Sequence, residues 1–232
     1  MAVEHEELSQ AMSLAKHDLS TPLSVAMGYL GMLLKGQAGP ISESQRKMLE
    51  ETQRSCARIN NLLNEMSAYG KLESGSSALA RLPLELGAVL AELASHMHEN
   101  GDHGVHIETR GTDRPLEVVG DRDSLKAALK TLLHLVVREQ TRGSVVVAEC
   151  STTGASQPAA IVAIGREAAV QELALAAETG RLVAEWKHGT GFALPIARRI
   201  VEAHGGTIWS APGDESFRPR SGMAIRLPLR TS

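Results

Sequence analysis

The first part of the chain carries an apolar repeat that leaves few folds open to it. Apolar residues recur in alternating steps of four and three over more than three heptads, which is typical of a long helix with one narrow apolar stripe. The positions are Leu8, Met12, Ala15, Leu19, Leu23, Ala26, Leu30 and Leu33. We therefore expect a single long helix over this stretch.

A short break separates this stretch from a second one. It contains Gly36, Gly39 and Pro40, and glycine is well suited to end a helix. Ser42 follows as a candidate cap for the next helix, and Glu43 is favourable in its first turn. The chain is therefore expected to turn back on itself here.

The second stretch has apolar residues on two sides. The main stripe comprises Met48, Thr52, Ser55, Ile59, Leu62, Met66 and Tyr69, and a second apolar edge comprises Leu49, Cys56 and Leu63. An isolated hairpin of two such helices cannot hide both stripes. Pairing with a second copy in a four-helix bundle hides them. The sequence therefore predicts a homodimer.

The apolar period changes near residue 78, where shorter runs begin. Strands are predicted at 78–86, 105–109, 116–119, 144–150, 159–164, 207–210 and 223–229. Helices are predicted at 87–98, 123–139 and 192–204. This mixed order, with strands clustered late, is typical of an α+β two-layer sandwich. We therefore expect a helical hairpin in residues 1–76 and a sandwich in residues 77–232.

Charge and composition argue against several classes of function. The 232 residues carry a net charge of -3 with Lys and Arg scattered, which argues against a nucleic-acid partner. The acidic N-terminus lacks the features of a signal peptide, and no run approaches the roughly 20 apolar residues that cross a bilayer. Cys56 and Cys150 alone make no disulfide framework. The sequence predicts a cytoplasmic protein without a membrane span.

The stretch from Ala15 to Leu23 contains a residue that is unfavourable in a helix interior. Pro22 removes a backbone hydrogen bond and clashes with the preceding turn, which costs roughly 3 kcal/mol. A distortion there would loosen the helix one turn after His17, where a partner has to approach the imidazole. His17 and Thr21 lie four residues apart, so they are expected to share an exposed strip beside the apolar stripe.

The run from His17 to Leu23 resembles the H-box of two-component histidine kinases, and the order of hairpin, linker and sandwich also resembles that family. The resemblance implies that His17 is the phosphoacceptor and uses a neutral ring nitrogen as nucleophile. It implies that Asp18 polarises the other ring nitrogen. It also implies that Thr21 positions a water for dephosphorylating a bound response regulator. Ser20 stands where the family has arginine.

A second resemblance to this family lies near the end of the chain. Gly189, Thr190 and Gly191 precede a predicted helix that ends at Gly205, and the run resembles the second glycine box of the GHKL-type ATP-binding domain. The resemblance implies that Gly189 and Gly191 contact phosphate oxygens through backbone amides at a helix N-terminus. Ala193 replaces the family's third glycine, which weakens this expected contact.

Other groups that the family uses to bind ATP are missing. The chain has no asparagine after Asn100, and Leu135 stands where the family's asparagine binds Mg²⁺. Glu139 is a candidate substitute ligand. The aspartate that reads adenine is missing too, because the chain has none between Asp123 and Asp214. We therefore expect no firmly bound cofactor, although the family implies ATP and Mg²⁺.

Two further segments bear on ligands. Residues 168–188 replace the family's ATP lid, and their Ala, Leu and Glu predict a helix packed on the domain. His96, His98, His103 and His106 have a spacing that could hold Zn²⁺ or Ni²⁺. Such a stretch is more often a solvated helix end and loop. No metal site is predicted.

Three hypotheses of function follow from these patterns. In the first, a degenerate histidine kinase exchanges phosphoryl groups between His17 and a response-regulator aspartate, or hydrolyses that aspartyl phosphate, with impaired ATP-dependent autophosphorylation. In the second, the chain is an active autokinase with a divergent ATP pocket built from residues 189–191 and Glu139. In the third, it is a non-catalytic pseudokinase that scaffolds or regulates other signalling proteins. The first accounts for both the complete hairpin motif and the eroded glycine box.

Overall fold

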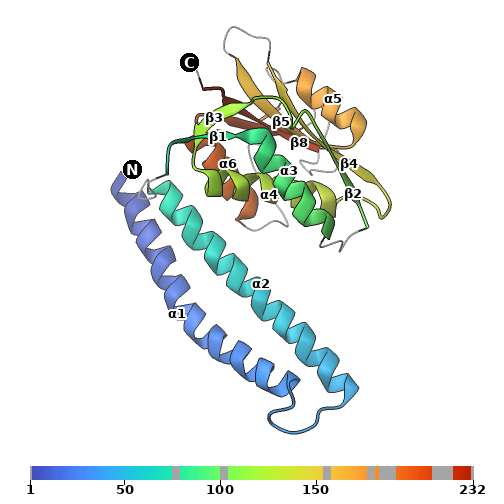
Figure 1. Ribbon diagram of the computed structural model, residues 1–232. Helices are drawn as coiled ribbons and strands as arrows, with labels where there is room; N and C mark the ends of the chain where they lie inside the picture. The colour runs from blue at the N-terminus through green and yellow to red at the C-terminus, as the bar shows by residue number, and fades with distance from the viewer. Residues whose placement is uncertain are drawn as a thin grey trace. The chain divides into compact units, whose positions relative to one another are not determined.

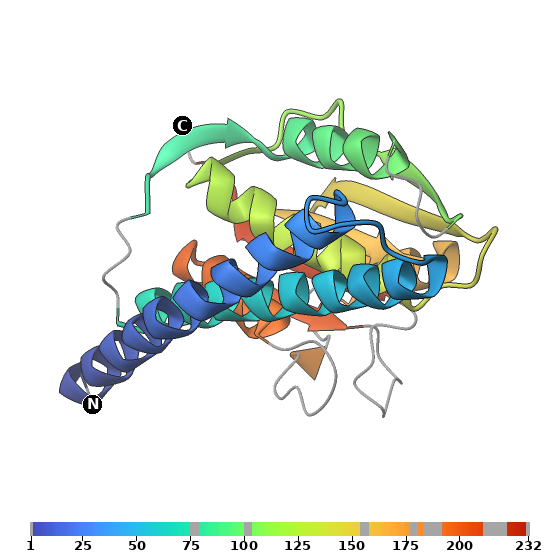
Figure 2. The same cartoon turned by 90° about the horizontal axis from the view of Figure 1, so that it is seen from below.

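The computed structural model describes residues 2–74, 79–99, 104–153, 158–176, 181–182, 192–210 and 222–230. The chain forms two compact units, residues 1–77 and 78–232 (Figure 1). The first unit is a hairpin of two long helices, α1 (Ala2–Leu34) and α2 (Glu43–Glu73). The two helices run side by side in both views (Figures 1 and 2). The predicted hairpin is confirmed.

The turn between the two helices uses the residues that the sequence suggested. Gly36 and Gly39 have φ angles of 72° and 108°, in the left-handed region that favours glycine. Ser42 opens α2 with a capping box, because its hydroxyl accepts a hydrogen bond from the Gln45 N–H at 3.2 Å. Gln45 Oε1 in turn accepts one from the Ser42 N–H at 2.8 Å. These bonds fix where α2 begins.

Small residues bring the helices close together where α1 starts and α2 ends. A Cβ atom added to Gly70 would lie 3.2 Å from Met12 Sδ and 3.2 Å from Ser9 Cα. Ser74 Oγ donates to Ser9 Oγ at 3.3 Å, and Ser67 is buried. A larger side chain at Gly70 would therefore push the helices apart.

The two apolar stripes of α2 differ in exposure. Leu63, from the second apolar edge, is buried and lies on the same side of the helix as Gly70, since seven residues separate them. Met48, Ile59 and Leu62 from the main stripe are 68%, 49% and 45% exposed. The second edge therefore faces α1, and the main stripe stays open in the isolated hairpin.

The second unit combines helices with two sheets. Its helices are α3 (Leu86–Glu99), α4 (Arg122–Arg138), α5 (Glu167–Leu175) and α6 (Ala193–Ala203). Its strands are β1 (Leu82–Glu85), β2 (His106–Arg110), β3 (Glu117–Gly120), β4 (Val145–Thr152), β5 (Ala159–Gly165), β6 (Arg181–Leu182), β7 (Thr207–Ser210) and β8 (Gly222–Pro228). β1 and β3 pair antiparallel, and the other strands form a six-stranded sheet in the order β2-β4-β5-β8-β7-β6. The α+β sandwich is confirmed.

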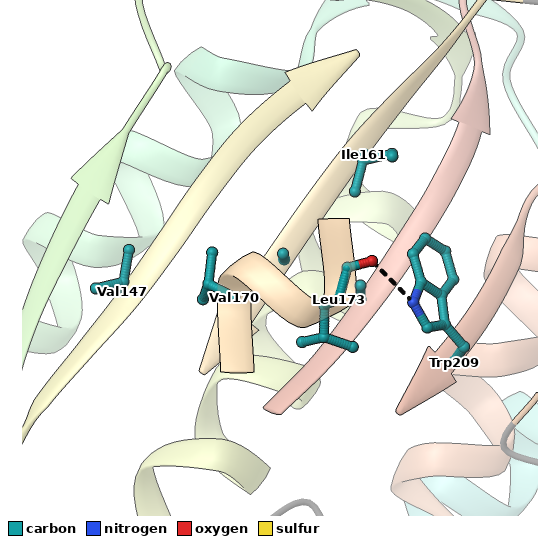
Figure 3. Close-up of a cluster of buried hydrophobic side chains, with 7 residues drawn as sticks. Val147, Ile161, Val170, Leu173 and Trp209 are labelled. Atoms are coloured by element: carbon teal, nitrogen blue, oxygen red, sulfur yellow. Dashed lines mark hydrogen bonds between the residues drawn. The ribbon is translucent and has the colours of Figure 1, made fainter. Parts of the chain in front are cut away.

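The six-stranded sheet has helices on both faces. On one face α4 contacts β5 and β8, α6 contacts β7, and α3 contacts β2 and β4. On the other face α5 packs against β4, β5 and β8, as Figure 3 shows with α5 in front of the strands and the other helices behind. Because both faces are covered, all seven residues of β5 are buried, which explains its uninterrupted apolar run.

The core beneath α5 is built around one tryptophan. Ala224 lies opposite both Ala163 and Trp209 in the sheet register, so the three side chains share a face. Val170 and Leu173 of α5 pack onto this face in the same buried cluster (Figure 3). The indole N–H of Trp209 donates to the Leu173 carbonyl oxygen at 3.3 Å. The indole is therefore buried with its polar atom satisfied.

The structure corrects two predicted elements. The strand predicted at 78–86 begins only at Leu82, because the Ala80 N–H donates to the Asp121 carboxylate instead of a neighbouring strand. Leu86 already belongs to α3. The helix predicted at 168–188 ends at Leu175, and residues 181–182 pair with β7 as a strand. Pairing with the edge strand β7 overrides the helical propensity at residues 181–182. Residues 177–180 and 183–188 lie outside the described residues.

Candidate functional site

His17 lies on the open surface of α1, and its ring is oriented by its neighbour. The His17 and Asp18 side chains are 81% and 66% exposed, and His17 Nδ1 lies 3.1 Å from Asp18 Oδ1. A carboxylate accepts hydrogen bonds and does not donate them, so Nδ1 carries the proton in this pair. The lone pair of the neutral ring is then on Nε2. The arrangement leaves a nucleophilic nitrogen accessible to a partner.

The turn of helix after His17 holds the two other residues of the motif. Thr21 is exposed, and its Oγ1 donates to the His17 carbonyl oxygen at 3.3 Å. Pro22 lies inside α1, which continues to Leu34. Proline has no N–H, so it donates no helical hydrogen bond to the carbonyl four residues earlier, at Asp18. The backbone ladder is thus weakened directly beside the imidazole, and the exposed positions of His17 and Thr21 agree with the sequence prediction.

An exposed apolar strip runs along α1 on either side of Thr21. At 3.6 residues per turn, Leu14, Thr21, Val25 and Met32 point within about 20° of one direction, with His17 about 60° away. Leu14, Val25 and Met32 are 63%, 53% and 47% exposed. Tyr29, at the edge of the strip, is 64% exposed. An apolar strip this close to a reactive group is suited to contact with another protein.

The expected ATP-binding positions are occupied differently. Gly189 and Gly191, the predicted phosphate contacts, lie outside the described residues. Leu135 is 6% exposed on α4 and is apolar, so it offers no ligand to a metal ion. Glu139 follows the last residue of α4 as its C-cap, with Arg138 Nη2 at 4.0 Å from its carboxylate. The proposed substitute ligand is therefore beyond the end of the helix and beside a cation.

The end of β5 was expected to lack the family's adenine-reading carboxylate, and the nearest one is already paired. Glu167 follows the strand by two residues and begins α5. Its two carboxylate oxygens lie 2.8 and 2.7 Å from the two terminal nitrogens of Arg110. This bidentate pair lowers the pKa of Glu167. The carboxylate therefore holds α5 to β2.

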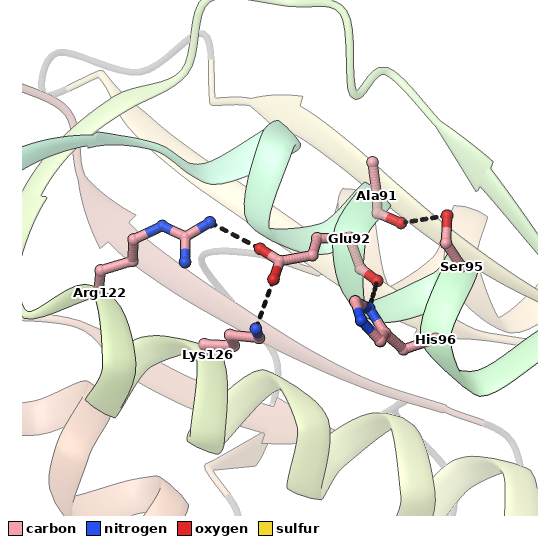
Figure 4. Close-up of polar contacts among 6 residues, drawn as sticks. All are labelled: Ala91, Glu92, Ser95, His96, Arg122 and Lys126. Atoms are coloured by element: carbon pink, nitrogen blue, oxygen red, sulfur yellow. Dashed lines mark hydrogen bonds and ion pairs between the residues drawn. The ribbon is translucent and has the colours of Figure 1, made fainter. Parts of the chain in front are cut away.

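A charged cluster between α3 and α4 escaped the sequence reasoning. Glu92 accepts hydrogen bonds from Lys126 and Arg122, both at 2.6 Å (Figure 4). These cations, Lys126 first, lower the pKa of Glu92 to about 2. Residues some thirty positions apart carry no sequence signal for pairing. The cluster holds two helices together and is unrelated to His17.

The histidine cluster forms no metal site within the described residues. No group of three metal-ligating side chains occurs there. His96 Nδ1 forms a hydrogen bond with the Glu92 carbonyl oxygen at 2.8 Å (Figure 4). This nitrogen is therefore engaged within α3. His103 and the side chain of His98 lie outside the described residues.

Comparison with known proteins agrees with these features. Residues 7–75 match the His Kinase A (phospho-acceptor) domain family. The probable sensor histidine kinase TcrY of Mycobacterium tuberculosis is 27% identical over 231 residues, which cover 93% of this chain and 44% of that protein. The circadian input-output histidine kinase CikA of Synechococcus elongatus is 24% identical over 223 residues, covering 87% of this chain and 29% of that protein.

Solved structures share the fold of the chain. Full-length ShkA in complex with AMPPNP superimposes with a TM-score of 0.65 at 18% identity, covering 97% of this chain and 47% of that one. The histidine kinase AdeS of Acinetobacter baumannii gives a TM-score of 0.56 at 18% identity, covering 93% of this chain and 98% of that one. These likenesses extend over both the hairpin and the sandwich.

Residues 7–75 thus match the phospho-acceptor domain of histidine kinases, and the chain as a whole is similar to two-component sensor histidine kinases. The chain spans less than half the length of the two relatives named above. No helix in the described part of the chain is both long enough and apolar enough to cross a membrane. The cytoplasmic location stays a prediction.

Proposed function

We propose that the chain passes phosphoryl groups between His17 and an aspartate of a response-regulator receiver domain, with impaired ATP-dependent autophosphorylation. The observation that carries this proposal is the exposed His17 ring with Asp18 at 3.1 Å from Nδ1. That geometry supports a nucleophilic Nε2. The match of residues 7–75 to the His Kinase A (phospho-acceptor) domain family supports the same chemistry.

The transfer step balances without a further reactant. The Nε2 lone pair of His17 attacks the phosphorus of an aspartyl phosphate, and the bond from phosphorus to the aspartate oxygen breaks. The receiver aspartate leaves as a carboxylate, and the ring becomes a phosphorylated imidazole that carries positive charge. Asp18 stabilises that charge through the Nδ1–H. The reverse step returns the phosphoryl group to the receiver.

Hydrolysis of the receiver's aspartyl phosphate is the second activity that we propose. Thr21 Oγ1 donates a hydrogen bond to the His17 carbonyl oxygen, so its lone pairs are available to accept a hydrogen bond from water. A water held by Thr21 would attack the phosphorus of a receiver docked over His17. Phosphate and the free aspartate are the products. The receiver supplies its own Mg²⁺.

The receiver domain would dock on the exposed apolar strip of α1. Leu14, Val25 and Met32 line this strip, with Tyr29 at its edge. The strip lies on the helix surface next to His17, so a partner that covers it also meets the imidazole. Apolar surface of this kind is enriched in the centres of protein interfaces.

A second copy of the chain would cover the open stripe of α2. Met48, Ile59 and Leu62 are about half exposed or more in the single hairpin, as is Leu19 of α1. A four-helix bundle would bury this apolar surface, which favours the predicted homodimer. Light scattering of the wild type and of Ile59→Glu tests this: we expect a dimer for the first and a monomer for the second.

Impaired use of ATP is supported by the second unit. Leu135 is buried where a metal ligand is required, and the carboxylate nearest the end of β5 is paired with Arg110. Neither position offers a free oxygen to Mg²⁺ or to an adenine amine. The family's fold is retained while these two groups are absent from their expected positions.

The test uses receiver domains phosphorylated with acetyl phosphate and then freed of it. Acid-labile phosphate should appear on the wild type and be absent from His17→Gln. Thr21→Ala should accept phosphate normally while its hydrolysis of the receiver's aspartyl phosphate falls. A parallel reaction with radiolabelled ATP and Mg²⁺ should leave the wild type almost unlabelled.

The other two hypotheses are the contrary outcomes of this test. Label from ATP that disappears in His17→Gln would establish the active autokinase with a divergent pocket. No phosphate on His17 from any receiver, with no hydrolysis, would favour the non-catalytic scaffold. Either result overturns the proposal.

A further inference from the structure

Asp121 connects three separate parts of the second unit through its own polar groups. Its Oδ1 accepts from the Ser124 N–H at 2.8 Å and caps the start of α4. Its Oδ2 accepts from the Ala80 N–H at 3.1 Å, and its own N–H donates to His204 Nε2 at 2.9 Å. The N–H donors of Ser124 and Ala80 lower the pKa of Asp121, which is consistent with an ionised carboxylate.

His204 is fixed by hydrogen bonds at both ring nitrogens. The ring is buried at the C-terminal end of α6, with Nδ1 at 2.6 Å from the Ile200 carbonyl oxygen. A carbonyl only accepts, so Nδ1 carries the proton, and Nε2 accepts from Asp121. A Cβ atom on Gly120 would lie 2.5 Å from His204 Cδ2. The ring therefore fills its site, and a single tautomer satisfies both partners.

These bonds form one continuous path between distant segments. It runs from the Ala80 N–H to the Asp121 carboxylate, and from the Asp121 N–H through the His204 ring to α6. Ala80 lies close to the N-terminal end of the second unit, which begins at residue 78. α6 begins at Ala193, directly after the predicted glycine box. The path thus connects a helix beside the expected ligand position with the point where the chain enters the unit.

We propose that Asp121 and His204 form a relay through which the placement of α6 controls how firmly Ala80 is held on the second unit. A shift of α6 moves Nε2 away from the Asp121 N–H. The Asp121 N–H then loses its acceptor, and the Asp121 carboxylate holds Ser124 and Ala80 less firmly. The proposal is independent of phosphoryl transfer at His17, because it concerns contacts within the second unit.

The test compares two substitutions of His204. The side-chain amide of each takes the place of a different ring nitrogen. In His204→Gln the side-chain oxygen can reach the position of Nε2 and accept from Asp121. In His204→Asn the amide lies near Nδ1 and cannot reach Asp121. Both variants of the whole chain are followed by amide hydrogen exchange at Ala80, with the amide of Val162 in buried β5 reporting global opening.

We expect exchange at Ala80 to accelerate about five- to tenfold in His204→Asn, corresponding to the loss of one hydrogen bond. Exchange at Val162 should change by a smaller factor. His204→Gln should exchange at Ala80 within about twofold of the wild type. Asp121→Asn keeps the helix cap but should accelerate amide exchange at Ala80, because it replaces the acceptor of the Ala80 N–H. Asp123→Asn, on the first turn of the same helix, should leave the exchange rate at Ala80 unchanged.

Two results would overturn the relay. One is an unchanged Ala80 exchange rate in His204→Asn, because the hydrogen bonds described above connect His204 with Ala80 through Asp121. The other is an equal acceleration at Ala80 and Val162, which would make the effect one of global stability. If His204→Asn does not fold, His204→Gln carries the test, because an acceleration at Ala80 beyond twofold relative to Val162, with the acceptor for the Asp121 N–H retained, would overturn the relay.

Discussion

The two units differ in how far the groups at their candidate functional positions are exposed. On the hairpin, His17 and Asp18 are exposed by 81% and 66%, and they bond each other rather than a surrounding core. In the sandwich, Leu135 is buried, and the carboxylate of Glu167 is held by Arg110. A group that must react with a partner has to be accessible, whereas a group that stabilises a fold is paired or covered. The contrast supports the proposal that phosphoryl transfer takes place on the first unit.

The largest effect is expected for Trp209→Ala. The indole is buried under α5 and bonds the Leu173 carbonyl, so its removal should lower the free energy of unfolding by about 3–5 kcal/mol. Urea titration monitored by circular dichroism measures the change. Leu175 of α5 is 87% exposed, so Leu175→Ala should change the free energy of unfolding by less than about 0.5 kcal/mol. Loss of phosphoryl acceptance by His17 in folded Trp209→Ala would contradict the division of roles.

Leu135→Asn tests whether restoring one polar group reopens the sandwich to metal chemistry. The amide would replace a buried apolar side chain, so we expect stability to fall by about 2–4 kcal/mol. Leu135→Met, which preserves volume, should cost less than about 1.5 kcal/mol. Labelling with ATP should stay at the wild-type level in both. Label on His17 in Leu135→Asn would show that a single residue separates this chain from an autokinase.

Asp18→Asn tests the hairpin side of the contrast. The amide retains the shape but not the negative charge that stabilises the phosphorylated ring, so transfer from a phosphorylated receiver should slow about a hundredfold. Quench-flow or gel-based transfer rates measure this. Glu7→Gln, an exposed carboxylate on the same helix, is the matched control. A rate within threefold of the wild type would remove Asp18 from the mechanism.

The smallest effect is expected for the Glu92 cluster. The pKa of Glu92 is lowered from 4.5 to about 2 by Lys126 and Arg122. Its contribution to stability is therefore fully present above pH 4.5 and is lost as the pH falls towards 2. Glu92→Gln should be slightly less stable than the wild type at pH 7, and the two should converge at pH 2. A constant difference across this range would argue against a charge effect.

Local patterns predicted the elements better than the contacts between them. The heptad spacing and Ser42 gave both helices of the hairpin, because helix periodicity and caps are encoded within a few residues. The pairing of residues 181–182 with β7 was missed, since a strand edge far along the chain decides it. The same holds for Asp121 and His204, which are 83 positions apart.

The candidate site divides in the same way. His17, Asp18 and Thr21 lie within about one turn of the same helix, so a short sequence motif was sufficient to find them. That the second apolar edge of α2, and not the main stripe, faces α1 was not predicted. The small side chains of Ser67 and Gly70 decide that question by allowing close approach, and hydrophobic periodicity gives small residues little weight.

The position of β8 has a consequence for the order of events during synthesis. β5 pairs with β8, which begins 57 residues after β5 ends, as the register of residues 165 and 222 shows. The centre of the sheet cannot close until residues 222–228 have left the ribosome, whereas the hairpin needs only contacts among the first 74 residues. The hairpin should therefore form, and offer its open stripe to another copy, while the sheet is still incomplete. Two chains made on one messenger would have their first chance to meet at that stage.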